Sequence, residues 1–355
     1  MKKKLLALFM AMTMVTMSLT ACGTVGGADE QTETTVTDES QTNADATEET
    51  DASTETQSAT TEGKVYKIGI CQQLEHQALD AATEGFKAAL VEKLGEGNVE
   101  FDYQNAQGEQ PNCATIATKF VNDNVDLIMA NATTALQACA AATADIPVIG
   151  TSVTDFVSAG VVNSNEAPGR NVTGTSDLAP IDQQVALVLE LAPEAKNVGI
   201  LYCSAEPNSI FQADMAEAMF KENGLTVERY TVADSNDIQQ VVTKVAEESD
   251  VIYIPTDNTL ANNMEIVKNV TVPAKKPVIV GEENMCGVGA LATLSISYYS
   301  LGYNAGMMAY EILVNGANPA EMPIEYADEV TLKYNAEIAA ALGMTMPEDM
   351  VAIGE

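Results

Sequence analysis

Residues 65–80 read VYKIGICQQLEHQALD, and this stretch contains the unit on which the fold is based. Its first six residues, Val65–Ile70, form a short run rich in β-branched residues, which is typical of a buried strand. Polar residues follow at once, and the chain then continues with the apolar spacing of a helix. A strand that passes through a polar loop into a helix predicts one βα unit.

The same alternation recurs along the chain and predicts an α/β fold with parallel sheets covered by helices. Gly95 and Pro111 support the helix boundaries, because glycine often ends a helix and proline is tolerated in the first turn. Further strands are expected at Val99–Tyr103, Val125–Met129 and Ile146–Gly150.

A second set of strands follows a helix expected around Ile181–Leu191. These strands are expected at Val198–Tyr202, Leu225–Tyr230, Val251–Ile254 and Pro277–Val280. Their starts lie 126 to 133 residues after those of the first set, which predicts two similar Rossmann-like lobes.

The domain assignment follows from this repeat. Residues 64–176 with about 290–318 are assigned to an N-terminal lobe, and residues 177–289 with about 319–355 to a C-terminal lobe. The segments after about residue 290 are too short for a third domain, so we expect them to cross back and complete both sheets. They comprise strands near 291–295 and 330–333 and helices near 300–314 and 336–342.

The first 22 residues have the layout of a lipoprotein signal peptide. Three lysines precede the apolar run Leu5–Val15, which is too short to span a bilayer comfortably. The run leads to Leu19–Gly23, which resembles the bacterial lipobox, in which the cysteine, here Cys22, is lipidated and becomes the mature N-terminus. We therefore expect an extracytoplasmic protein anchored by lipid to the outer face of the cytoplasmic membrane. The alternative is an ordinary cleavable signal with an incidental cysteine.

Residues 23–63 contain 11 Asp or Glu and no Lys or Arg, and they predict a disordered acidic tether. The whole chain carries a formal net charge of −34, which disfavours nucleic acid and anionic lipid as partners. Apart from the signal there is no apolar run of about 18 residues.

Five cysteines follow Cys22 at wide spacings with no C-x-x-C motif, and we interpret them as small buried residues, with one disulfide left open. They are Cys71, Cys113, Cys139, Cys203 and Cys286. The single histidine, His76, argues against a His/Cys zinc cluster, and no cofactor is expected.

Polar residues gather where the predicted strands end, which is where open parallel sheets bind ligands. In the first half they are Gln72, Gln73, Glu75, His76, Asn131, Thr133, Thr134, Thr151, Ser152, Thr154 and Asp155. In the second half they are Ser204, Glu206, Asn208, Ser209, Thr256, Asp257, Asn258, Glu282, Glu283 and Asn284. Such residues are often simple helix caps, but the same free N–H groups bind carboxylates. Nearby acidic side chains suit an ammonium group, so a cleft between the lobes would suit a zwitterion.

Six motifs carry a resemblance to ABC-transporter substrate-binding lipoproteins of the tryptophan/tyrosine-binding type. They are Ile70–Asp80 (ICQQLEHQALD), Val153–Gly160 (VTDFVSAG), Pro168–Asp177 (PGRNVTGTSD), Ile200–Ser209 (ILYCSAEPNS), Tyr253–Asn258 (YIPTDN) and Gly289–Met308 (GALATLSISYYSLGYNAGMM). The resemblance spans nearly all of residues 65–350. It implies a type I periplasmic-binding fold, hinge closure on a ligand that is most often an aromatic amino acid, and delivery to a permease and ATPase pair.

Carried over by position, the resemblance implies ligand contacts at Glu75, His76, Thr133, Thr134, Thr154, Asp155, Asn208, Ser209, Asp257, Asn258 and Tyr298. We expect helix-start N–H groups and the hydroxyls of Thr133, Thr134 and Ser209 to hold the ligand carboxylate. Its ammonium group is expected to face Asp155 or Asp257. Two positions depart from the family pattern: Gln77 replaces a usual proline, and Ser297 replaces a frequent acidic residue, which bears on how the ammonium group or side chain of the ligand is recognised.

Two other functions fit the same sequence features. A sensory lipoprotein would also need only ligand capture and closure. An amino-acid racemase would need paired thiols facing the cleft, and Cys71 and Cys203 lie near the ends of the first strands of the two lobes.

Overall fold

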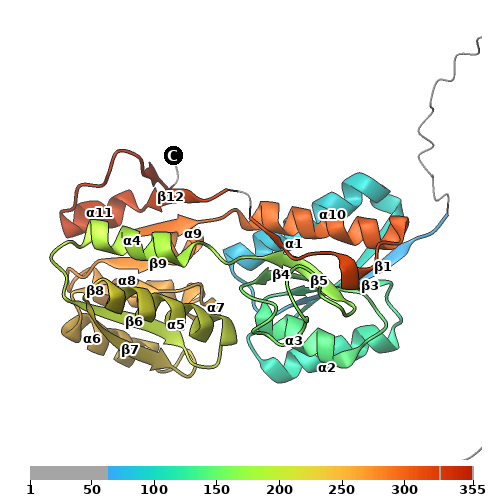
Figure 1. Cartoon of the computed structure of the whole chain (residues 1–355), viewed down its shortest axis with the longest axis horizontal. Coiled ribbons are helices and arrows are strands. Elements are labelled where there is room, and N and C mark those ends of the chain that lie inside the picture. Colours follow the sequence, from blue (N-terminus) through green and yellow to red (C-terminus); the bar gives the residue numbers. More distant parts are fainter. Residues whose placement is uncertain (1–62, 328, 354–355) are drawn as a thin grey trace, which may run out of the picture. The chain divides into compact units, whose positions relative to one another are not determined.

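The computed structural model describes residues 63–327 and 329–353, which form two α/β lobes with one sheet each (Figure 1). The predicted signal peptide, the lipidation site Cys22 and the acidic tether lie outside the described residues, apart from Gly63 at the end of the tether. The α/β fold with mostly parallel sheets is thereby confirmed.

The first lobe contains a six-stranded parallel sheet in the order β11-β5-β4-β3-β1-β2. Its strands are β1 (Tyr66–Gln72), β2 (Val99–Asn105), β3 (Leu127–Asn131), β4 (Val148–Val153), β5 (Val172–Ser176) and β11 (Glu325–Tyr326). Helices α1 (Gln77–Leu94) and α10 (Tyr298–Asn315) cover one face, and α2 (Gln110–Asn122) and α3 (Thr133–Ala142) cover the other (Figure 1). Two short 3₁₀ turns, Glu96–Asn98 and Pro319–Glu321, complete the lobe.

The second lobe contains a seven-stranded sheet in the order β13-β12-β10-β9-β8-β6-β7, in which only the β10–β12 pair is antiparallel. Its strands are β6 (Asn197–Cys203), β7 (Thr226–Val232), β8 (Val251–Ile254), β9 (Val278–Val280), β10 (Ala292–Ser295), β12 (Thr331–Tyr334) and β13 (Val351–Ala352). Its helices are α4 (Ile181–Leu191), α5 (Pro207–Glu222), α6 (Ile238–Glu248), α7 (Asn258–Ala261), α8 (Met264–Thr271), α9 (Glu283–Gly289) and α11 (Ala336–Leu342).

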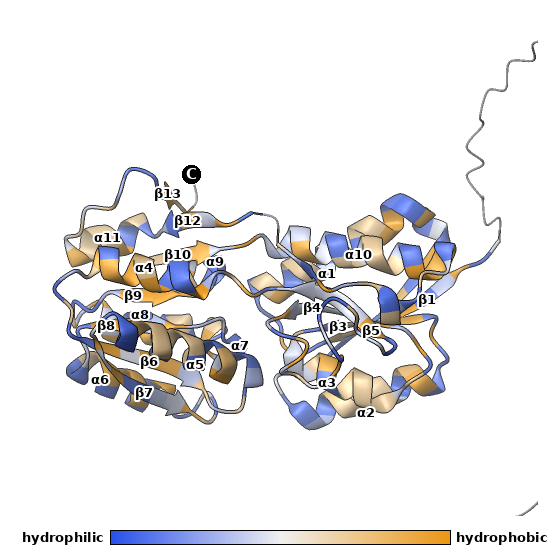
Figure 2. Ribbon diagram, in the orientation of Figure 1, coloured by the Kyte–Doolittle hydropathy of each residue, from blue (hydrophilic) through white to orange (hydrophobic). Residues whose placement is uncertain are grey.

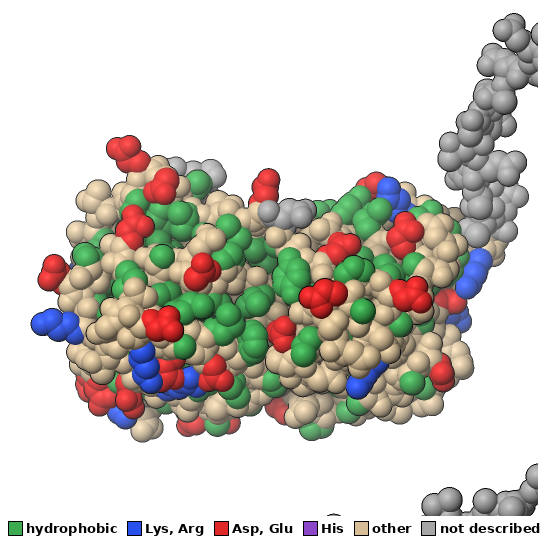
Figure 3. Space-filling view, in the orientation of Figure 1, with side chains coloured by type: hydrophobic (Ala, Val, Ile, Leu, Met, Phe, Trp, Pro, Cys, Tyr) green, Lys and Arg blue, Asp and Glu red, His purple; other side chains and the backbone are tan. Residues whose placement is uncertain are grey.

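Both sheets have apolar residues on both faces, as parallel sheets between helix layers require. Strands β3, β4 and β8 are buried along their whole length, and Figure 2 shows apolar residues along the sheets and the inner sides of the helices. The acidic excess lies outside these cores, and Figure 3 shows red side chains spread over both lobes with few blue ones.

Glycine allows two close backbone contacts in the first lobe. A Cβ on Gly174, whose φ is +150°, would lie 1.9 Å from the carbonyl oxygen of Gly150 on the neighbouring strand. A Cβ on Gly302 would lie 1.9 Å from the carbonyl oxygen of Ala82, so α10 packs directly on the backbone of α1.

The chain passes between the lobes three times, as the expected return of the last segments requires. The first crossing leads from β5 to α4, the second from β10 to α10, and the third from β11 to β12. The predicted lobe boundaries were wrong in the last part of the chain. Strand β10 pairs with β9 and therefore belongs to the second lobe, although residues from about 290 were assigned to the first. Strand β11 pairs with β5 in the first lobe, although residues from about 319 were assigned to the second. An apolar run predicts a strand, but it does not specify which of two similar sheets the strand joins.

The five described cysteines are buried and free, which confirms their interpretation as small core residues. Cys71, Cys113 and Cys139 share one core of the first lobe, whereas Cys203 lies in a core of the second. Cys203 also lines a cavity between the lobes, but Cys71 is fully buried in its core, so the two thiols do not face each other across a cleft as a racemase would need.

Candidate functional site

The polar loops of the two lobes meet at the carboxyl ends of the strands, as predicted for a ligand cleft. Two hydrogen bonds join the lobes there. His76 Nε2, at the start of α1, lies 3.1 Å from Asn258 Oδ1, at the start of α7. Gln212 Nε2, in α5, donates to Thr154 Oγ1, after β4, over 3.3 Å. The loops of both lobes therefore line one site.

The N-terminus of α3 offers an uncapped anion-binding site. Its N-cap residue is Ala132, with φ +89°, and an alanine side chain cannot accept the free N–H groups of the first turn. Thr133, the first helical residue, is 3% exposed, and its Oγ1 is buried without a hydrogen-bond partner. Thr134 beside it is also buried. Helix N–H groups with adjacent hydroxyls are well suited to a carboxylate.

The second lobe contributes two buried carboxylates whose oxygens are held by their own lobe. Asp257 caps α7 by accepting from Leu260 N over 2.8 Å, and it also accepts from Cys203 N over 2.6 Å and Ser209 Oγ over 2.7 Å. Glu206 accepts five hydrogen bonds, from the main chain and side chains of Asn258 and Thr259 and from Asn208 Nδ2. Burial raises the pKa of Asp257, and the negative charge of Glu206 raises it further. This part of the cleft is therefore strongly electronegative.

Glu206 also sets the orientation of neighbouring acceptors. It accepts from Asn258 Nδ2 over 2.7 Å, which directs Asn258 Oδ1 toward His76. Burial lowers the pKa of His76, so the ring is neutral, with its proton on Nε2 and an acceptor at Nδ1. His76 Nδ1 is buried without a partner, and so is Oδ1 of Asn208, whose Nδ2 is held by Glu206.

A third polar group lies where the first crossing between the lobes begins and the second one ends. Asp177, directly after β5, accepts from Tyr298 Oη over 2.9 Å and from Thr154 Oγ1 over 3.0 Å. Burial raises the pKa of Asp177 to about 6. Burial and the negative charges of Asp177 and Glu282 raise the pKa of Tyr298 well above its usual value, so its hydroxyl remains a neutral donor.

Two cavities lie between the lobes in the described residues. The first, of about 300 Å³, has α1 residues His76 and Gln77 on one side and Ala261, Met264, Glu282 and Val288 among those on the other. The second, of about 530 Å³, has Gln73, Leu74 and Thr134 facing Cys203, Glu206 and Thr259. Neither cavity is lined by lysine or arginine.

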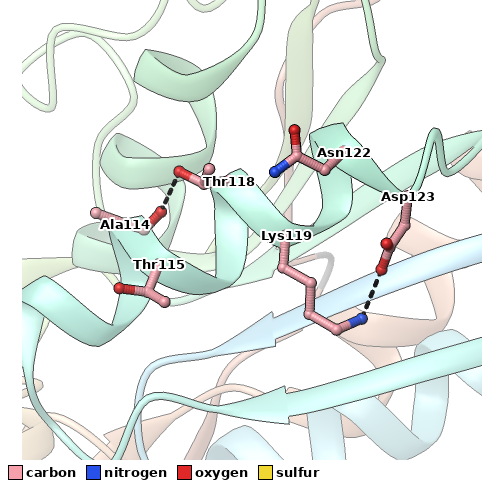
Figure 4. A pocket seen from close by; sticks show the side chains of 6 residues that line it. All are labelled: Ala114, Thr115, Thr118, Lys119, Asn122 and Asp123. Atoms are coloured by element: carbon pink, nitrogen blue, oxygen red, sulfur yellow. Dashed lines mark hydrogen bonds and ion pairs between the residues drawn. The ribbon is translucent and has the colours of Figure 1, made fainter.

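A hollow on the outside of α2 has different properties (Figure 4). Some of its polar groups are paired along α2, since Thr118 Oγ1 donates to the carbonyl oxygen of Ala114 and Lys119 binds Asp123. None of the buried polar atoms without a hydrogen-bond partner in the described residues belongs to this hollow, whereas several belong to the cleft.

Most of the predicted site residues gather at the cleft, and two lie at more exposed positions of the same loops. Glu75 is exposed and accepts from Tyr103 Oη over 3.4 Å. Asp155 closes the turn after β4 by accepting from Ser158 N over 2.6 Å. Ser297 is exposed and caps α10 by accepting from Ser300 N, a role that an acidic residue can also perform. The departure at Ser297 is therefore a change of helix cap.

Three residues with central positions were not among the predicted ligand contacts. Glu206 is the acceptor that holds the second lobe's loops together, and Gln212 makes one of the two bonds between the lobes. Asp177 ends the motif Pro168–Asp177, which the sequence analysis associated with the family but not with ligand binding. The sequence did contain a signal for Asp177, because it is an acidic residue directly after strand β5.

Within the described ranges, no cluster of three or more His, Cys, Asp or Glu side chains has the arrangement of a metal site. No helix in the same ranges is both long and apolar enough to cross a membrane.

Residues 67–354 match the model of a family described as "ABC transporter substrate binding protein". This chain belongs to that family. A relative from Clostridioides difficile called "Tyrosine-binding protein" is 42% identical over 283 residues, which are 79% of this chain and 82% of the relative. The family assignment, the α/β fold and the substrate-binding class inferred from sequence are confirmed.

Solved structures of similar proteins agree with this family and with its fold. An ABC domain from Streptococcus pneumoniae in complex with L-Trp is 37% identical, with a TM-score of 0.78, over 80% of this chain and 97% of that one. A ligand-free, open substrate-binding protein from Clostridium difficile is 40% identical but has a TM-score of 0.65, over 81% and 99%. The structure described here thus resembles the ligand-bound relative more than the open one, which agrees with the two hydrogen bonds that join its lobes.

Proposed function

We propose that this substrate-binding protein captures an aromatic amino acid as a zwitterion between its lobes and delivers it to an ABC permease and ATPase. The observation that carries the proposal is the concentration of unpaired polar atoms at the cleft. Six of the eight buried side-chain atoms without a partner in the described residues lie at the carboxyl ends of strands or in the loops and helix starts that follow them. They are Gln73 Oε1, His76 Nδ1, Asn131 Oδ1, Thr133 Oγ1, Ser152 Oγ and Asn208 Oδ1.

Unpaired buried polar atoms are costly, and native proteins keep few of them. A polar ligand would satisfy these atoms. The hydroxyls of Thr133 and Ser152 and the free N–H groups of α3 suit its carboxylate, while the acceptors of His76 and Asn208 suit donors. The proposed contacts are the predicted residues that the fold brings to the cleft: His76, Thr133, Thr134, Thr154, Asn208, Ser209, Asp257, Asn258 and Tyr298.

The choice of an aromatic amino acid rests on two relatives, one called tyrosine-binding and one solved with L-Trp. The cleft is compatible with this class, because the cavity beside His76 has apolar walls at Ala261, Met264 and Val288. Its volume of about 300 Å³ can accept a ring.

A thermal-shift screen of the 20 amino acids, nucleosides and small sugars, followed by calorimetry, tests the proposal. We expect tyrosine, tryptophan or phenylalanine to give the largest stabilisation. Thr133→Val, which removes the unpaired hydroxyl but keeps the shape, should weaken binding by about 10-fold or more, since a hydrogen bond to a charged group contributes about 1.5–3 kcal/mol. Thr118→Val on the outside of α2 is the matched control and should leave affinity unchanged. The proposal fails if no amino acid binds the wild type.

The lipid anchor and the location outside the cytoplasm are further parts of the proposal. They rest on the sequence Leu19–Gly23, and Cys22 is the proposed lipidation site. Detergent-phase partitioning should place the wild type in the detergent phase and Cys22→Ala in the aqueous phase, with both proteins folded. Equal partitioning of the two would exclude the anchor.

A further inference from the structure

Asp177 differs from the other buried carboxylates of the cleft in what holds it. Its side chain is 4% exposed, and its two hydrogen-bond partners are neutral hydroxyls, Tyr298 Oη on Oδ2 and Thr154 Oγ1 on Oδ1. The structure shows no ion pair with Asp177 among the described residues. A carboxylate accepts about four hydrogen bonds, so about half of its capacity is unused.

The other buried carboxylates have structural tasks that require an acceptor at a helix start. Asp257 accepts Leu260 N, and Glu282 accepts the backbone N–H groups of Asn284 and Met285. Glu206 accepts those of Asn258 and Thr259. Asp177 caps no helix start, and the only backbone group that acts on its carboxylate is its own N–H, so its charge is not explained by helix capping.

A buried charge without a cation destabilises the folded state. Burial raises the pKa of Asp177 to about 6, which is the expected sign of that penalty. An asparagine would keep one acceptor oxygen, and its Nδ2 could donate to the hydroxyl on the other side, because a hydroxyl can accept as well as donate. A carboxylate that is costly to fold and unnecessary for packing indicates a cationic ligand, because functional sites are retained at the expense of stability.

The surroundings place Asp177 at the junction of the two lobes. Its partner Thr154 also accepts from Gln212 Nε2 of the second lobe over 3.3 Å. Its other partner, Tyr298, is the first residue of α10 and follows the second crossing between the lobes. Asp177 is therefore connected to Gln212 of the second lobe through Thr154, and it lies next to two of the three crossings.

We propose that Asp177 binds the ammonium group of the amino-acid ligand, and that Tyr298 and Thr154 are the positioning residues that orient its carboxylate. This inference rests on the proposed function and specifies one contact of it. It replaces Asp155, whose carboxylate closes the turn at Ser158, as the first-lobe partner of the ammonium group. The ligand is thus held at both ends by the first lobe, with its carboxylate at α3 and its ammonium group at Asp177.

The test compares L-tyrosine with 3-(4-hydroxyphenyl)propionate, which has the same ring and carboxylate but lacks the ammonium group. Both ligands are titrated by calorimetry into the wild type, Asp177→Asn and the matched control Asp155→Asn. We expect the wild type and Asp155→Asn to prefer tyrosine by about 100-fold or more, as is typical of a buried charge pair. Asp177→Asn should lose most of this preference, because the variant and the deaminated ligand remove the same interaction.

Thermal unfolding of the ligand-free proteins provides the second readout. Asp177→Asn should be at least as stable as the wild type, whereas a purely structural carboxylate would make the variant less stable. The inference is overturned if Asp177→Asn keeps the preference for tyrosine, or if it is less stable than the wild type. Failure of tyrosine and the other aromatic amino acids to bind the wild type would instead refute the proposed function.

Discussion

His76 provides the sharpest test of how the lobes are held together. Its Nε2 lies 3.1 Å from Asn258 Oδ1 across the cleft, and burial lowers the pKa of the ring, so the bond joins two neutral groups. His76→Phe keeps a ring of similar size but removes the donor. In the joined arrangement Asn258 Oδ1 would then be buried without a partner, whereas water would satisfy it once the lobes separate.

The expected size of the effect follows from this difference between the joined and the separated lobes. Leaving a buried acceptor unpaired costs about 1–3 kcal/mol, and this cost falls only on the joined arrangement. The equilibrium constant for joining the lobes should therefore fall by about 5- to 150-fold. If the ligand is held only between joined lobes and the ligand-free lobes are mostly separated, its apparent dissociation constant rises by the same factor.

Calorimetry with tyrosine, tryptophan and phenylalanine on the wild type and His76→Phe measures the factor. The bond to Asn258 and the Nδ1 acceptor proposed for the ligand's polar end are the same for all three ligands, so all three should weaken to the same extent. Glu75→Gln is the control, since Glu75 is exposed, belongs to the same loop and makes no bond across the cleft that the structure shows. An affinity within twofold of the wild type would refute the reasoning, and a loss confined to one ligand would show that His76 recognises the side chain of that ligand instead.

Three further results are expected. Gly302→Ala should destabilise the protein by about 1–3 kcal/mol in urea unfolding, because its Cβ would lie 1.9 Å from the carbonyl oxygen of Ala82, while Gly97→Ala, with open space around it, should have little effect. Burial raises the pKa of Glu282 to about 7, so its contribution to the stability of the ligand-free protein is present below the unfolded pKa near 4 and is lost as the pH rises through 7. Between pH 5 and pH 8, the stability of Glu282→Gln, measured by calorimetry, should therefore change less than that of the wild type. Small-angle scattering should show a smaller radius of gyration on adding the ligand, and an unchanged value at saturation would contradict hinge closure.

The elements that sequence predicted best are those with local signals. Helices α4 and α11 have the predicted bounds, and Gly95 ends α1 as expected, because apolar periodicity and capping act over a few residues. Strand β5 was missed because Val172–Ser176 contains glycine, threonine and serine and has no apolar run. Its glycine is required by the approach to Gly150 on β4, which is a contact between distant parts of the chain.

In the candidate site, too, features with local signals could be predicted, and features that depend on distant contacts could not. The loops that carry polar residues could be located from strand ends alone, and His76 and Thr133 indeed lie there with unpaired atoms. The roles of Asp155 and Asp177 could not be separated in this way, since both are acidic residues near strand ends. Only the folded structure distinguishes them. Asp155 closes its own turn, whereas Asp177 accepts a hydrogen bond from Tyr298, which lies 121 positions later in the chain.

The order of the crossings also determines when the first lobe can be completed as the chain is made. Its core includes Ala305, Met308, Ala309 and Ile312 of α10, and its sheet ends with β11 at Glu325–Tyr326. A chain that emerges N-terminus first therefore presents all of the second lobe's central strands before the first lobe can close its core. Truncated chains that end before residue 298 lack the helix that covers one face of the first sheet. Such fragments expose apolar surface, which makes them prone to aggregation and to degradation by quality-control proteases.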